Sequence, residues 1–143
     1  MNDTTFPWAR ILAAIDASAH RHRVLAAVRA LALLTGSAVD VLHVDADASA
    51  FDTASEIETE DAVAGIVDAA VEELGAAGVA AKGLVAHATE ADIDDAILST
   101  ARSLGSDLIV LGPNHRRGLG AWLEASVTDQ VTHRTSIPVL LIP

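Results

Sequence analysis

Short apolar runs alternate along the chain with longer segments in which apolar residues recur every three or four positions. The runs are typical of buried strands, and the longer segments are typical of helices with one buried face. Because this alternation continues through the sequence, it predicts an α/β fold: an open, doubly wound sheet of five parallel strands with helices on both faces, in a single domain over residues 1–143. The predicted strands span residues 10–15, 38–44, 79–87, 107–112 and 137–142.

The first predicted helix is marked by residues at both of its ends. Asp16 and Ser18 offer turn and N-cap chemistry directly after the first strand. Apolar positions then recur with helical spacing, and Gly36 ends the helix. The last predicted helix is short and spans about residues 124–133.

The middle helices have weaker boundary signals. Asp45–Asp61 is polar and acidic, and we interpret it as a mobile loop, with the second helix beginning near Glu56 or Thr59 and ending at Gly75. Thr89 and Asp92 have the spacing of a capping box at the start of the third helix, which is expected to run to about residue 104.

Three loops of the predicted fold are candidates for a ligand site. Doubly wound sheets bind ligands at the carboxyl ends of strands, where the winding reverses. The loops that follow Ile15, Val44 and Leu111 therefore deserve the closest inspection. Pro138 cannot donate to a ladder, so the last strand is expected at a sheet edge, and its apolar run is expected to be covered by a second chain.

Composition and charge narrow the choice of partner. The chain has 143 residues, 51% of them hydrophobic, and its 9 basic and 20 acidic residues give a net charge of −11. Such a charge argues against nucleic-acid and anionic-membrane binding. The absence of cysteine and of a signal-peptide pattern fits a cytoplasmic protein. A small ligand or a protein partner is left as the target.

The basic residues are not spread evenly. Four of the nine lie in two short clusters, His20–Arg23 and His115–Arg117, which follow the first and fourth strands. Arg21 is expected in the first turn of its helix, where a cation opposes the helix dipole. Either an anion binds between the clusters, or they are surface charges that pair with the many acids.

Two hydroxyl side chains at the start of the last predicted helix are further candidates for binding an anion. Ser126 and Thr128 begin the last helix, where they either cradle a phosphate with backbone N–H groups or simply cap the helix.

The sequence lacks a P-loop, a dinucleotide-binding fingerprint, a nucleophile elbow and the histidine spacing of a zinc enzyme. His43 and His87 are interpreted as strand histidines that are satisfied by hydrogen bonds.

The chain resembles the universal stress protein family. The resemblance rests on the run RILAAIDAS at residues 10–18, VLHV at 41–44, DLIVLG at 107–112 and IPVLLI at 137–142, and it covers nearly the whole sequence. It implies a Rossmann-like fold of the adenine nucleotide alpha hydrolase type. It also implies a homodimer formed through the C-terminal strand Val139, Leu140, Leu141 and Ile142, and in one branch of the family ATP bound at the switch point.

The resemblance also assigns roles to residues. It implies that Asp16 and Val44 hold the adenosine, and that phosphates lie in a loop of the form Gly, two residues, Gly, nine residues, Gly, then Ser or Thr. Gly112 and Ser126 match that loop, whereas His115 and Ala125 replace its second and third glycines. The predicted nucleotide site comprises Ala14, Asp16, Val44, Leu111, Gly112, Asn114, His115, Arg116, Arg117, Ala125, Ser126, Val127 and Thr128.

The functional hypothesis follows from this site. We expect a cytoplasmic, dimeric stress-response protein that binds ATP, with Mg²⁺, or another adenine nucleotide as a regulatory ligand. Strong catalysis is not expected, because only His115 near the phosphate loop suits a general base, although weak ATP hydrolysis stays open. The alternative is an interaction module of the same family that binds no nucleotide because its glycine loop is degenerate.

Overall fold

A five-stranded parallel sheet forms the centre of the protein. The computed structural model describes residues 8–46, 53–113 and 127–143, with the side chains of 53–59 and 127–130 left out of the description. The strand order is β3-β2-β1-β4-β5, which confirms the predicted doubly wound sheet. The strands are β1 Arg10–Ala14, β2 Ala38–Ala46, β3 Ala81–Ala88, β4 Leu108–Leu111 and β5 Val139–Leu141.

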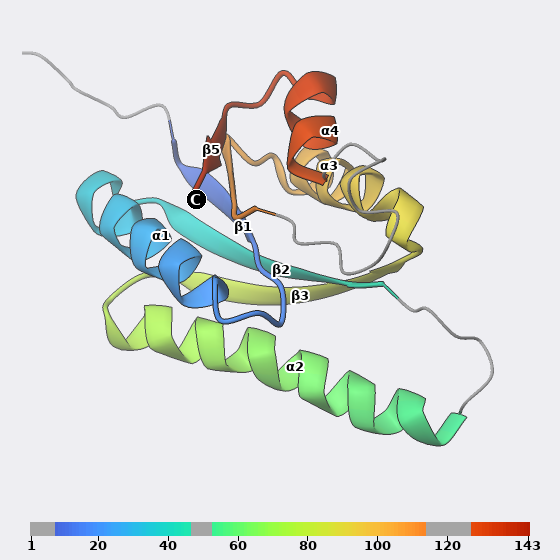
Figure 1. The fold of residues 1–143 in the computed structure, drawn as a ribbon. Coiled ribbons are helices and arrows are strands. Elements are labelled where there is room, and N and C mark those ends of the chain that lie inside the picture. The colour runs from blue at the N-terminus through green and yellow to red at the C-terminus, as the bar shows by residue number, and fades with distance from the viewer. Residues whose placement is uncertain (1–7, 47–52, 114–126) are drawn as a thin grey trace, which may run out of the picture.

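Helices cover both faces of this sheet, as Figure 1 shows. One face carries α1 and α2, and the other carries α3 and α4. The helices are α1 Arg21–Thr35, α2 Thr53–Ala76, α3 Ile93–Leu104 and α4 Val127–Arg134, with a 3₁₀ turn, η1 Glu90–Asp92, before α3.

The buried side chains form two layers, one on each side of the sheet. Successive residues of a strand point to opposite faces, so Ile11 packs under α1 and α2 whereas Leu12 packs under α3 and α4. In β4 all four residues are buried, as expected for a parallel strand covered on both faces. The first layer also contains Val24 and Leu74, and the second contains Val131.

The predicted loop Asp45–Asp61 is wrong for residues 45–46 and 53–61, and its residues 47–52 lie outside the described part of the chain. β2 continues to Ala46, and α2 already begins at Thr53. The early turns of α2 are rich in Glu and Asp, which favour a helix N-terminus through the helix dipole. Acidic polarity, which suggested a loop, instead belongs to the N-terminal turns of a long helix.

The predicted caps of α1 and α3 form turns instead. His20 occupies the N-cap position of α1 without a side-chain cap. Asp16 Oδ1 accepts hydrogen bonds from the Ser18 N–H at 2.9 Å and the Ser18 hydroxyl at 2.5 Å, so these two residues stabilise the loop before α1. At α3 the Thr89 hydroxyl donates to Asp92 Oδ2 across η1, and the capping box is not formed.

Gly83 explains why the third strand is weakly signalled in the sequence. The glycine lies in β3 against α2, where an added Cβ would come within 2.3 Å of Val67 Cγ1. A residue that is poor for a strand is therefore present because the helix packs closely on it.

The last strand lies at an edge of the sheet, as Pro138 predicted. β5 pairs with β4 on one side, and the Ile109 N–H donates to the Pro138 carbonyl at 2.9 Å. Leu140 and Leu141 remain 37% and 45% exposed. The described part of the protein therefore leaves apolar side chains on this edge strand.

Candidate functional site

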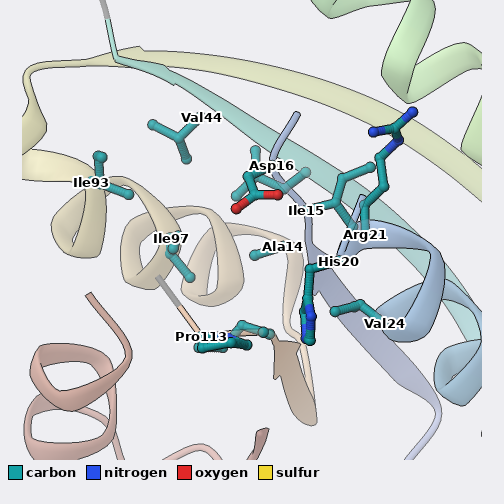
Figure 2. A pocket seen from close by; sticks show the side chains of 13 residues that line it. Ala14, Ile15, Asp16, His20, Arg21, Val24, Val44, Ile93, Ile97 and Pro113 are labelled. Atoms are coloured by element: carbon teal, nitrogen blue, oxygen red, sulfur yellow. The ribbon is translucent and has the colours of Figure 1, made fainter. Parts of the chain in front are cut away.

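A pocket opens at the switch point of the sheet, where β1 and β4 are neighbours and the helices that come after them in the chain, α1 and α4, cover opposite faces. The space between its lining side chains, including the solvent at its mouth, is about 630 Å³. Figure 2 shows the side chains that surround it. They are Ala14, Ile15, Asp16, His20, Arg21, Val24, Leu42, Val44, Ile93, Ile97, Leu111, Gly112 and Pro113.

One side of the pocket is apolar. Val44 comes from the end of β2, and Ile93 and Ile97 come from the first turns of α3. Ile93 and Ile97 are four residues apart, so they share one face of the helix, and Figure 2 shows them on the same side of the pocket as Val44. This arrangement suits a flat, weakly polar group such as a nucleobase.

Asp16 supplies a carboxylate at the mouth of the pocket. It lies two residues after the end of β1, and its side chain is exposed. Both hydrogen bonds from Ser18 fall on Oδ1, which orients the carboxylate, and no described residue donates to Oδ2. An oriented acceptor beside an apolar wall is what a sugar hydroxyl needs.

His20 and Arg21 form the side of the pocket nearest α1. The His20 Nε2–H donates to the Ile142 carbonyl at 2.8 Å, which ties the start of α1 to the residue after β5. Arg21 Nη1 donates to the carbonyls of Ala17 and Ser18 at 2.9 and 3.0 Å. Arg21 was singled out because a cation opposes the helix dipole there, and these bonds give it a structural role without any anion.

Gly112 lies next to the imidazole ring of His20. An added Cβ would come within 2.6 Å of His20 Cδ2 and 3.2 Å of Val24 Cγ2. Real Cβ atoms do not approach so closely, so a larger residue at position 112 would force the His20 ring or the backbone to shift. The packing of the protein itself thus accounts for this glycine.

The two strand histidines have polar neighbours, and the hydrogen bond of His43 confirms the interpretation of that residue. His43 is buried, and its ring makes a hydrogen bond through Nδ1 with the Ile15 carbonyl at 3.0 Å, which holds the chain beside Asp16. His87 Nδ1 lies 3.5 Å from Asp45 Oδ2 on the neighbouring strand.

An ion-pair cluster joins α3 to α4. Arg134 binds Asp94 and Asp95 at the start of α3. The Asp94 side chain is 2% exposed and that of Asp95 is 55% exposed. Hydrogen bonds from Asp95 and then Asp94 raise the pKa of Arg134, so the guanidinium stays charged at any pH used for an assay.

The structure brings together part of the predicted site. Five predicted residues line the pocket: Ala14, Asp16, Val44, Leu111 and Gly112. Six lie outside the described residues: Asn114, His115, Arg116, Arg117, Ala125 and Ser126. Val127 and Thr128 begin α4, and their side chains are outside the description as well.

The sequence-based prediction missed several pocket residues. His20 and Arg21 stood out as part of a basic cluster but were not placed in the site. Ile93 and Ile97 were missed because their helical spacing shows only that they share a face. The order of the strands in the sheet decides which strand ends lie beside that face of the helix.

Two further features concern only the part of the chain that the structure describes. Within those residues, no group of three or more His, Cys, Asp or Glu side chains is placed to hold a metal ion. No helix in the described ranges is both long and apolar enough to cross a membrane.

Fold and pocket together define an α/β protein with a pocket at the switch point of a parallel sheet. The model of the universal stress protein family matches residues 7–143. The chain therefore belongs to the universal stress protein family. A search of curated proteins found no match.

Solved structures show the same fold. A universal stress protein family member from Burkholderia pseudomallei is 23% identical with a TM-score of 0.76, covering 96% of this chain and 98% of that one. The universal stress protein from Archaeoglobus fulgidus in complex with dAMP is 21% identical with a TM-score of 0.69, covering 96% and 99%. A universal stress protein in complex with cAMP is 17% identical with a TM-score of 0.74, covering 95% and 97%.

Proposed function

We propose that this protein is a cytoplasmic stress-response protein that binds an adenine nucleotide as a regulatory ligand in the switch-point pocket. The observation that carries the proposal is the pairing of an apolar wall with the oriented carboxylate of Asp16 in one pocket. Adenine would lie against Val44, Ile93 and Ile97, and the ribose hydroxyls would donate to Asp16. Related proteins have been solved with dAMP and cAMP, which supports the same ligand class here.

The phosphates would extend from Gly112 toward the start of α4. On the resemblance to the family, Ser126, Val127 and Thr128, with His115, Arg116 or Arg117, are the residues proposed to meet them. Any Mg²⁺ is proposed to arrive on the phosphates of ATP, because Asp16 is the one carboxylate lining the described pocket and Mg²⁺ is commonly held by phosphates and water. We propose a binding role without strong catalysis.

Asp16→Asn tests the nucleotide proposal. The amide oxygen can still accept from Ser18, so the turn is kept, while the acceptor that faces the ribose is lost. Titration calorimetry with AMP and with Mg-ATP should show at least about ten-fold weaker binding than in the wild type. Asp68→Asn removes the same charge from an exposed position of α2 and should leave affinity unchanged.

Two results would contradict the proposal. One is the absence of binding to either nucleotide by the wild-type protein at millimolar concentration, together with no nucleotide released when the purified protein is denatured. That result would favour the alternative, a universal stress-type interaction module without nucleotide. The other is equal nucleotide affinity of Asp16→Asn and the wild type.

We also propose that the protein is a homodimer joined through β5. Leu140 and Leu141 are exposed on an edge strand, and an apolar edge that meets water favours pairing with another strand. A second copy of the same strand offers both the backbone partners and the apolar contacts.

Leu141→Asp tests the dimer. A charge in the paired edge would be desolvated in the dimer but not in the monomer, so the variant should be monomeric at concentrations near 10 μM, where the wild type is expected to be dimeric. Light scattering measures the mass directly. Leu33→Asp places the same charge at another exposed leucine, on α1, and should leave the dimer intact. A monomeric wild type would overturn the proposal.

A further inference from the structure

The imidazole of His20 occupies a defined place in the pocket. It lies at the Gly112 end, close enough to that glycine to exclude a Cβ, and Figure 2 shows it between Pro113 and Val24. The apolar wall of Val44 and Ile93 lies across the pocket from it. A nucleoside with its base on that wall and its ribose at Asp16 would therefore direct its 5′ end away from the wall, toward His20 and Gly112.

The bond to Ile142 fixes the tautomer of His20. A carbonyl oxygen can only accept, so Nε2 must carry the hydrogen in its 2.8 Å bond to Ile142. Nδ1 is then the nitrogen that is left to meet a ligand. Because the Nε2 bond can persist when the ring is protonated, protonation changes Nδ1 from an acceptor to a donor without requiring the ring to turn.

Backbone groups at the start of α1 are already used. The N–H groups of Arg21, His22 and Arg23 donate to the carbonyls of Ser18, Ala19 and His20. An anion at this helix end therefore has to be met by side chains. The first turn of α1 contains no acidic residue that would compete for those side chains.

Among the side chains at this end, His20 is the better placed. Arg21 is bound through Nη1 to the loop carbonyls, and in Figure 2 its guanidinium extends away from Pro113. The charged groups lining the same pocket are Arg21 and Asp16. A phosphate near Asp16 is repelled by the carboxylate, and a ring N–H of His20 that donates to the phosphate would offset that repulsion.

We infer that His20 is a phosphate-contacting residue of this pocket, that Nδ1 makes the contact, and that the Ile142 carbonyl holds the ring in position. The inference rests on the proposed function and adds to it a residue from outside the glycine loop. It also links the ligand to the end of β5, because the ring that meets the phosphate is held by the residue after that strand.

The variant His20→Gln distinguishes the hydrogen bond of the ring to Ile142 from its proposed contact with the phosphate. The glutamine amide nitrogen can take the place of Nε2 and keep the bond to Ile142, but it offers nothing in place of Nδ1. Titration calorimetry should show about five- to ten-fold weaker binding of AMP and less than two-fold change in binding of adenosine. Urea unfolding should show that the variant is as stable as the wild type.

His22→Gln is the matched control. His22 is two residues further along α1, its side chain is exposed, and it lines the groove between α1 and α2 instead of this pocket. Its affinity for both AMP and adenosine should equal that of the wild type. The fall in the ratio of AMP to adenosine affinity is a readout that a purely structural role of His20 would not produce.

The outcomes separate the two proposals. If wild-type protein binds AMP no better than adenosine, or if His20→Gln keeps the wild-type ratio, the role of His20 is overturned while nucleotide binding stands. If His20→Gln loses adenosine and AMP affinity equally, His20 has a structural role and the inference fails. If the wild type binds neither compound, the proposed function fails, and this inference fails with it.

Discussion

Gly112→Ala should destabilise the protein by about 1–3 kcal/mol, the usual cost of inserting a methyl group into a well-packed site. The added Cβ would lie 2.6 Å from the His20 ring and 3.2 Å from Val24. Relief of this overlap requires the imidazole to move, which breaks its bond to the Ile142 carbonyl. Urea unfolding measures the stability, and AMP binding should weaken in parallel.

A control and a double variant separate this effect from ordinary glycine effects. Gly75→Ala lies in α2 with no atom near the added Cβ, so it should be neutral or stabilise the protein by about 0.4–1 kcal/mol. In the His20→Ala background, Gly112→Ala should cost far less, because the ring that it overlaps is gone. Additive costs in the double variant would contradict the proposed contact, since residues in contact are expected to couple.

Asp94→Asn should cost about 1.5–3 kcal/mol of unfolding free energy, because it removes the charge from a buried hydrogen bond. The Asp94 side chain is 2% exposed and lies against Arg134 of α4. Asparagine keeps the shape of the side chain, so the change reports the loss of charge in a place where water cannot replace the partner. Urea unfolding at neutral pH is the measurement.

Asp95→Asn is the matched comparison. Asp95 is the next residue along the chain and binds the same guanidinium, but its side chain is 55% exposed. Exposed ion pairs contribute about 0–1 kcal/mol, so this variant should lie close to the wild type. Equal costs for the two variants would show that burial does not decide the strength of this cluster.

Local sequence signals were sufficient for the elements and failed at some of their boundaries. The run Leu108–Leu111 is apolar throughout, which is the pattern expected of a parallel strand covered on both faces. The start of α2 was missed because its acidic residues match both a polar loop and a helix N-terminus. Polarity alone cannot distinguish these two structures.

Some residues of the candidate site could be predicted from the sequence, and others could not. Asp16 and Gly112 could be placed from the sequence because each follows a strand at the end where ligands bind. His20 could be seen as part of a basic cluster, but its bond to Ile142 joins positions 122 residues apart. Patterns of residue spacing describe neighbours in the sequence, so they cannot predict a contact between positions so far apart.

The sequence by itself determined the class of fold, the order of its elements and the edge at which a ligand would bind, because these follow from local periodicity and from the chirality of strand–helix–strand connections. Only the tertiary structure decided which side chains meet at that edge. It placed the isoleucines of α3 opposite His20, and it showed that Gly112 makes room for that ring. Contacts of this kind depend on how the sheet brings distant strands and helices together, and the local pattern of residues does not record them.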